Sequence, residues 1–239
     1  MNKDADLLFN FGKNIWIVEG DIVNFFGFPY PTRSVVVKLA SGDLWVWSPV
    51  ALTDKLKTEL EVLGPVRHLI SPNKLHHLYL QDWIKEFPDV QVWGPESTVK
   101  KRKDLIFQVP LTDEEPSSWK DEIDQYWING SFFIDEMIFF HKESKTAILA
   151  DLSQNFSEDF LKKHWSWWKR IFAQMWGITE AKGLAPLEMR LTWYKKSGDS
   201  SRLKRLIAQN PENVIMAHGE CLKGGGMEFM PRSFRWLTG

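Results

Sequence analysis

Three apolar segments of the sequence each run directly into side chains that can bind a metal ion or transfer a proton. The three places are His76 and His77 after residues 66–70, Asp151 after residues 146–150, and His218 after residues 214–217. Histidine is the commonest metal ligand in proteins and the commonest acid–base group near neutral pH. Three imidazoles and one carboxylate form a ligand set that a single zinc or iron ion accepts. Each residue alone is more often structural, so the metal hypothesis depends on the fold bringing them together.

The first half of the sequence shows strands that alternate with helices. The predicted elements, in chain order, are strands at residues 14–18, 34–39 and 44–48, a helix at 52–63, a strand at 66–70, a helix at 78–87 and a strand at 90–93. Residues 20–32, rich in glycine and proline, are predicted to be a loop, and Thr53 is predicted to cap the first helix. This alternation predicts a parallel or mixed sheet. Ligands of open α/β folds bind at the carboxyl edge of the strands, where His76 and His77 fall.

The second half repeats a β block followed by helices. The predicted elements are strands at residues 123–128, 132–140 and 146–149, one long helix at 157–176, a helix from 200 or 201 to 209, and a strand at 214–217. Gly224–Gly226 is interpreted as a flexible turn, and the basic run at residues 100–103 as a solvated helix end. Two β blocks with amphipathic helices predict an α/β fold, a four-layer αββα sandwich formed by a single domain over residues 1–239.

The composition excludes several classes of protein. The net charge of the 239 residues is −1, which gives no indication of nucleic-acid binding. Cys221 is the only cysteine, so no intrachain disulfide is expected. The first six residues lack the basic start and apolar run of a signal peptide, and no apolar run has the length of a membrane span. These observations predict a cytoplasmic protein.

The order of elements over about residues 13–220 resembles the metallo-β-lactamase-like superfamily of metal-dependent hydrolases and oxidoreductases. The first motif of that superfamily, His-x-His-x-Asp-His, falls on Pro72-Asn-Lys74-Leu-His76-His77. Pro72 and Lys74 therefore replace the first two histidines, His76 replaces the aspartate, and His77 is retained. No histidine is present near Asn129 and Gly130, where the resemblance expects the next one. The chain looks like a divergent branch of the superfamily, a domain of unknown function bearing Leu75-His-His-Leu78.

The resemblance implies that one of two metal sites is lost and the other retained. Asp151 matches the bridging aspartate and His218 the final histidine, so the retained site would comprise His76, His77, Asp151 and His218. It implies a mononuclear metal-dependent hydrolase holding one zinc or iron ion, of unknown substrate. Lys74 is then a candidate for binding an anionic substrate group. Glu220 is a candidate for a hydrogen bond that orients one of the metal ligands.

The alternative is a metal-free degenerate homologue that acts as a ligand-binding or interaction protein. Fold alone does not decide between these two functions. The chain is rich in tryptophan, with 13 in all. The tryptophan face of helix 157–176 is predicted to be buried within the protein or in a homodimer rather than in a membrane. Aromatic residues of the loop and of this helix suggest an apolar substrate groove or a dimer face. They are Phe25, Phe26, Phe28, Trp165, Trp167 and Trp168.

Overall fold

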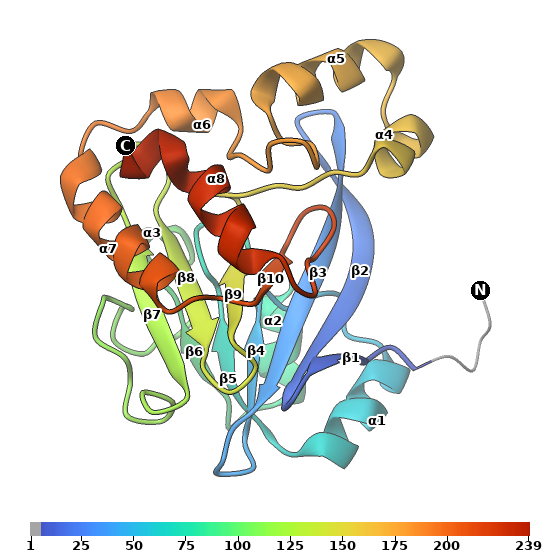
Figure 1. Ribbon diagram of the computed structural model, residues 1–239. Coiled ribbons are helices and arrows are strands. Elements are labelled where there is room, and N and C mark those ends of the chain that lie inside the picture. Colours follow the sequence, from blue (N-terminus) through green and yellow to red (C-terminus); the bar gives the residue numbers. More distant parts are fainter. Residues whose placement is uncertain (1–5) are drawn as a thin grey trace. The chain divides into compact units, whose positions relative to one another are not determined.

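The computed structural model describes residues 6–239. The prediction that a signal peptide is absent rests on residues 1–6, almost all of which lie outside this range. The described chain divides into two compact units, one of residues 6–21 with 32–110 and the other of residues 22–31 with 111–239. Each unit contains one sheet and its own helices (Figure 1). The predicted α/β class is confirmed, whereas the single domain over residues 1–239 stays a prediction.

The first unit is built on a six-stranded sheet in the order β1-β2-β3-β4-β5-β6. Its strands are β1 (Phe9–Gly12), β2 (Ile15–Phe25), β3 (Phe28–Lys38), β4 (Leu44–Trp47), β5 (Val66–Ile70) and β6 (Gln91–Trp93). β3 pairs with β4 antiparallel, and β4, β5 and β6 are parallel neighbours. The mixed sheet predicted from the alternation of strands and helices is therefore present, and the loop bearing His76 and His77 follows β5.

Three helices belong to the described part of this unit, and the first two connect the parallel strands β4 to β5 and β5 to β6, as parallel pairing requires. They are α1 (Asp54–Leu63), α2 (Leu80–Glu86) and α3 (Glu96–Lys101). The hydroxyl of Thr53 accepts a hydrogen bond from Leu56 N at 3.2 Å, which confirms the predicted cap. Leu56 and Leu60 of α1 and Trp83 of α2 are buried with strand residues in one apolar core. The basic run falls at the end of α3, as expected of a helix end.

The predicted loop at residues 20–32 is wrong. β2 and β3 continue to a two-residue turn at Phe26 and Gly27, where φ is +48° and +84°. Positive φ at both central positions suits the twist of a tight hairpin, and Asn24 Oδ1 accepts a hydrogen bond from Gly27 N at 2.7 Å. The prolines Pro29 and Pro31 lie within β3 rather than ending it. The tip of this hairpin, residues 22–31, belongs to the second unit.

The second unit is built on a four-stranded sheet in the order β10-β9-β8-β7. Its strands are β7 (Ile123–Ile128), β8 (Glu136–His141), β9 (Thr146–Leu149) and β10 (Asn213–Met216). β10 is parallel to β9, and the other pairs are antiparallel. The carboxyl ends of β9 and β10 therefore lie at the same edge, and they lead to Asp151 and His218.

Five helices complete the described part of the second unit. They are α4 (Glu158–His164), α5 (Trp167–Trp176), α6 (Leu187–Leu191), α7 (Lys196–Ala208) and α8 (Gly226–Thr238). α7 packs on β7 and against α8, which in turn contacts β10 (Figure 1). The sequence predicted a start near residue 200 for α7 and a turn at Gly224–Gly226. The helix α8 that begins at Gly226 was not predicted.

The single helix predicted over residues 157–176 is also wrong, because the chain leaves the helical conformation at Trp165 and Ser166. Trp165 adopts extended dihedral angles, and its indole Nε1 donates to Pro29 O at 2.8 Å. Its ring packs on Phe156 with centroids 5.4 Å apart. Burying this one large ring against the hairpin replaces the helical hydrogen bonds lost at the break. Within residues 6–239, no helix combines the length and apolar character needed to cross a bilayer.

Candidate metal centre

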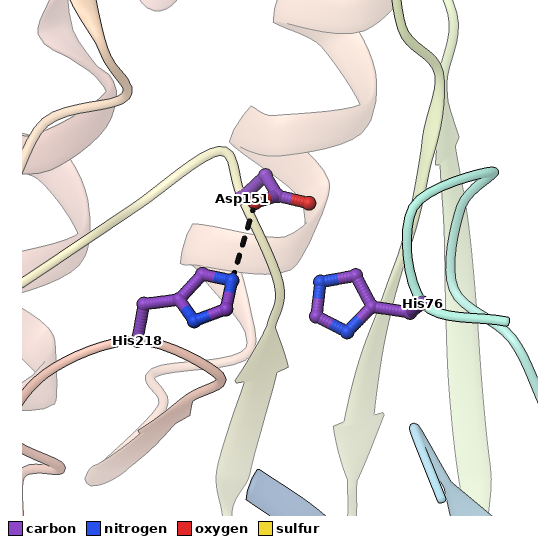
Figure 2. Close-up of side chains that lie close together, drawn as sticks. All are labelled: His76, Asp151 and His218. Carbon is purple, nitrogen blue, oxygen red and sulfur yellow. Dashed lines mark ion pairs between the residues drawn. The ribbon is translucent and has the colours of Figure 1, made fainter. Parts of the chain in front are cut away.

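Asp151 and His218 face each other just beyond the ends of two parallel strands. Asp151 follows β9 by two residues and His218 follows β10 by two residues, so the pairing of the strands brings the side chains together. His218 Nε2 lies 3.4 Å from Asp151 Oδ1, and both side chains are buried (Figure 2). The two side chains therefore lie close together within the second unit, and their predicted role as ligands of one site stays a prediction.

The protonation of His218 follows from its other ring nitrogen. Nδ1 lies 2.8 Å from the carbonyl oxygen of Pro31. A carbonyl oxygen only accepts hydrogen bonds, so Nδ1 carries the proton and donates it. In the neutral ring, Nε2 then presents a lone pair to the Asp151 carboxylate. Two acceptors that face each other at this distance require a cation between them, either a proton on Nε2 or a metal ion.

The separation of these two atoms is compatible with two ligands of one metal ion. Charge-assisted hydrogen bonds from nitrogen to a carboxylate oxygen are about 2.7–2.9 Å long, shorter than the 3.4 Å between His218 Nε2 and Asp151 Oδ1. Two ligand atoms that lie about 2.0–2.1 Å from zinc at the tetrahedral angle are roughly 3.3–3.4 Å apart. An imidazole nitrogen and a carboxylate oxygen are also the donors that zinc and iron accept. The pair therefore fits the group that the fold family implies.

The surroundings of the pair hold His218 in one orientation. The ring of Tyr30 packs edge-on against the imidazole, with centroids 5.0 Å apart. The carbonyl of His218 accepts a hydrogen bond from Asn155 N at 3.2 Å. Gly219 has a φ of +95°, and a Cβ there would lie 2.3 Å from the Asn155 carbonyl. Glycine is therefore required for the chain to leave β10 and place His218 beside Asp151.

A buried carboxylate, Glu136, holds the backbone that carries Asp151. Its oxygens accept hydrogen bonds from Ala150 N at 2.8 Å, Asp151 N at 2.7 Å and Leu152 N at 3.1 Å. Burial, together with the Asp151 charge, raises the pKa of Glu136 to about 8, while the three N–H groups favour the charged form. When Glu136 is ionised, this second carboxylate near Asp151 makes the site more favourable for a cation.

His76 lies in the first unit, in an irregular loop between β5 and α2. Ser71 Oγ donates to Asn73 O and to His76 O, both at 2.9 Å, and α2 begins only at Leu80. The imidazole Nδ1 lies 2.8 Å from Ser48 Oγ. A hydrogen bond at one ring nitrogen is the usual means of orienting a histidine whose other nitrogen binds a metal. The environment of His76 is therefore compatible with a ligand role.

His77 and Lys74 lie among positive charges in the same unit. Arg102 Nη1 donates to His77 Nδ1 at 3.1 Å and to His77 O at 3.0 Å. Burial, then the charges of Lys101 and Arg102, lower the pKa of His77 to about 4. Lys101 Nζ donates to Lys74 O at 2.9 Å. Cations beside His77 disfavour a metal ion there and favour an anion.

Comparison with known proteins identifies the family. A model of a domain of unknown function, DUF4336, matches residues 13–162. The chain belongs to this family. No curated protein matches the sequence of this DUF4336 protein.

Solved structures that resemble the DUF4336 protein share its fold at low identity. The DIM-1 metallo-β-lactamase exposed to ceftazidime is 15% identical, with a TM-score of 0.63 over 98% of this chain and 95% of that chain. A metallo-β-lactamase from Pontibacter korlensis is 12% identical, with a TM-score of 0.62 over 96% and 97%. The metal-soaked Flv1 flavodiiron core from Synechocystis sp. PCC6803 is 11% identical, with a TM-score of 0.61 over 97% and 60%. The metallo-β-lactamase-like fold predicted from the sequence is confirmed.

Two further positions named in the sequence analysis form hydrogen bonds outside the Asp151–His218 pair in this DUF4336 protein. The carboxylate of Glu220 accepts a hydrogen bond from Ser157 Oγ at 3.0 Å, at the start of α4. Asn129 and Gly130, where the resemblance expects a histidine, donate their backbone N–H groups to the buried Asp199 at 3.1 and 2.7 Å. A structural carboxylate thus holds the turn at which a ligand of the first metal would stand.

Sequence reasoning missed Glu136 and Tyr30. Glu136 begins a strand whose next four residues are apolar, and a lone acid in such a strand is a detectable sign of a buried carboxylate. Tyr30 lies between two prolines in a segment that was predicted to be a loop, and nothing in its local pattern indicates a contact with His218. Burial, then the Asp151 charge, raise the pKa of Tyr30, so its phenol stays protonated beside the pair.

Proposed function

We propose that this DUF4336 protein is a mononuclear metal-dependent hydrolase that holds one zinc or iron ion. Asp151 and His218 supply two ligands, and the observation that carries the proposal is the 3.4 Å separation of Asp151 Oδ1 and His218 Nε2 with Nδ1 already protonated. A metal ion bound between them would be an acceptor of a lone pair from each atom.

His76 is the third ligand in this proposal. His76, Asp151 and His218 each offer one ligand atom. Ser48 occupies Nδ1 of His76, which leaves Nε2 as the nitrogen for the ion. His77 was predicted as a further ligand, but the guanidinium of Arg102 at its Nδ1 opposes a second cation nearby. His77 and Lys74 instead belong to a positive region suited to an anionic substrate group.

The chemistry follows from the ligand set. A bound zinc ion lowers the pKa of its water to about 7 and so supplies hydroxide near neutral pH. Asp151 and His218 hold their positions because Glu136 binds the backbone N–H of Asp151 and Pro31 accepts the Nδ1 proton of His218. Lys74 and Lys101 would attract a carboxylate or phosphate of the substrate.

Metal content after purification tests the proposal. We expect one zinc or iron ion per chain by elemental analysis, and loss of the ion in Asp151→Ala and His218→Ala. His164→Ala is the matched control, since His164 is a partly buried histidine on α4 that stacks on Phe160. Two ions per chain would refute the single site. Full metal content in the double variant His76→Ala/His218→Ala would refute the ligand assignment.

The second candidate function is a metal-free protein that binds an anionic ligand. The cations of Lys101 and Arg102, held at Lys74 and His77 by hydrogen bonds, favour it. In that case the cation between Asp151 and His218 is a proton, and the wild type contains no stoichiometric metal after growth with added zinc and iron. Binding of inorganic phosphate, measured by calorimetry and weakened in Lys101→Gln, would then support this function.

A further inference from the structure

A surface of exposed aromatic and aliphatic side chains covers the hairpin tip and α5 in the second unit. Exposure is 87% for Phe26, 68% for Trp167 and 63% for Met175. We call these residues the aromatic surface, together with the other exposed apolar residues of the two elements. The additional members are Phe25, Trp168, Ile171 and Phe172. Large exposed apolar patches of this kind mark binding sites for proteins or lipid bilayers.

The hairpin tip and α5 are fixed to each other, so their exposed residues form one surface. Phe28 of the hairpin contacts Trp168 and Trp176, with ring centroids 6.4 and 5.4 Å apart. Lys169 Nζ donates to Gly27 O and lies 5.0 Å from the centroid of the Phe28 ring. Figure 1 shows α5 directly beside the hairpin tip, where β2 turns into β3.

The exposed apolar face of α5 is wide and continuous. A helix turns by about 100° per residue, so Trp167, Ile171, Met175, Trp168 and Phe172 fall within an arc of about 140°. Only the opposite side of α5 is buried, at Ala173. The sequence predicted that the tryptophan face is buried within the protein or in a homodimer. The face is exposed in the single chain, so its cover by a second copy stays a prediction.

Most charged residues near the aromatic surface are basic, although Glu158 and Glu180 line a hollow together with Trp167 and Ile171. Residues 22–31 contain no acidic or basic side chain, and residues 160–176 contain no acid. Four cations lie in the latter segment, namely Lys162, Lys163, Lys169 and Arg170. Lys162 pairs with Glu158 at 2.7 Å, and Lys169 lies 5.3 Å from the centroid of the Trp168 ring.

We propose that the aromatic surface binds the interface of an anionic lipid bilayer without crossing it. Tryptophan and phenylalanine partition into the headgroup region, and flanking lysine and arginine attract anionic lipid. A second copy is a poorer occupant, because a two-fold contact through this surface would place Lys169 and Arg170 near their own equivalents, while Glu158 at its border already pairs with Lys162. The hairpin that enters the lipid is the one whose Pro31 orients His218.

Vesicle binding tests this inference without reference to the metal. The probes are phosphatidylcholine vesicles with and without phosphatidylserine, and the readouts are co-flotation and a blue shift of tryptophan fluorescence. We expect binding that is stronger with phosphatidylserine. Trp167→Glu should weaken binding at least about tenfold, because a charged side chain opposes insertion. Val62→Glu, which changes an exposed apolar residue of α1, is the matched control and should bind as the wild type does.

Three outcomes would overturn the inference. The first is that the wild type binds neither type of vesicle. The second is that Trp167→Glu, shown to be folded by its melting curve, binds as well as the wild type. The third is a concentration-dependent dimer in sedimentation that Trp167→Glu abolishes, since this would identify a second copy as the occupant. Arg170→Gln separates the electrostatic part, because it should reduce the preference for phosphatidylserine and leave binding to phosphatidylcholine unchanged.

Discussion

Replacing Glu136 should reveal how strongly it stabilises the turn that carries Asp151. Glu136 accepts three backbone hydrogen bonds from residues 150–152, and its side chain is fully buried. A buried N–H left without an acceptor costs about 1–3 kcal/mol. Glu136→Gln keeps one carbonyl oxygen for the two N–H groups at Oε2 but turns an amide NH₂ toward Ala150 N, so it should cost about 1–3 kcal/mol. Glu136→Leu removes every acceptor and should cost about 3 kcal/mol or more.

Urea denaturation followed by tryptophan fluorescence measures both free energies of unfolding. The control is Glu180→Gln, an exposed glutamate that should change the free energy of unfolding by less than about 0.5 kcal/mol. If the free energy of unfolding depends on urea concentration with the same slope in all variants, the substitutions change stability rather than the compactness of the folded or the unfolded state. Two results would show that the three hydrogen bonds do not stabilise the turn. The first is a free energy of unfolding for Glu136→Leu within about 1 kcal/mol of the wild-type value. The second is that the Gln and Leu variants have equal free energies of unfolding.

Glu136 should also make the free energy of unfolding decrease as pH rises. Burial, then the Asp151 charge, raise the pKa of Glu136 to about 8 from an ordinary value of 4.5. Its contribution to stability is therefore full below about pH 4.5 and is lost as pH rises to about 8. If the whole shift belonged to Glu136, the loss would be at most about 5 kcal/mol. Relative to Glu136→Gln, the wild type should become less stable from pH 5 to pH 9. The opposite trend would show that the N–H donors dominate and keep Glu136 charged.

Three further predictions concern His77, Gly219 and the metal. Burial, then the charges of Lys101 and Arg102, lower the pKa of His77 to about 4, so NMR titration should show a neutral ring at pH 5.5. The contribution of His77 to the free energy of unfolding should be full above pH 6.5 and lost as pH falls through about 4. Gly219→Ala should lower the free energy of unfolding by about 3 kcal/mol, because a Cβ there meets the Asn155 backbone, whereas Gly224→Ala, at a φ of +82° in open space, should cost only about 1 kcal/mol. Zinc at 100 times its Kd should raise the free energy of unfolding of the wild type by about 2.7 kcal/mol and should leave that of Asp151→Ala unchanged. An equal increase in both proteins would show that the ion binds elsewhere.

Local patterns in the sequence were enough to predict most elements of the fold and the types of residue at their ends. The spacing of apolar residues is a local property, so the strands and the helix α1 with its Thr53 cap could be predicted from neighbouring residues. Polar residues directly after apolar strands fall at the carboxyl edge of a sheet, and this pattern, in the order that the resemblance expects, predicted that His77, Asp151 and His218 converge. The parallel pairing of β9 with β10 places Asp151 and His218 side by side, whereas their role as a shared site stays a prediction.

The chemistry of that site and the exposure of the aromatic residues depend instead on tertiary contacts. The tautomer of His218 depends on Pro31 O, which is 187 positions away in the sequence, and the position of Asp151 depends on Glu136. The break at Trp165 accompanies contacts of its ring with the hairpin, where its Nε1 donates to Pro29 O. Such contacts join residues that are distant along the chain, and no local pattern encodes which distant partner each side chain meets.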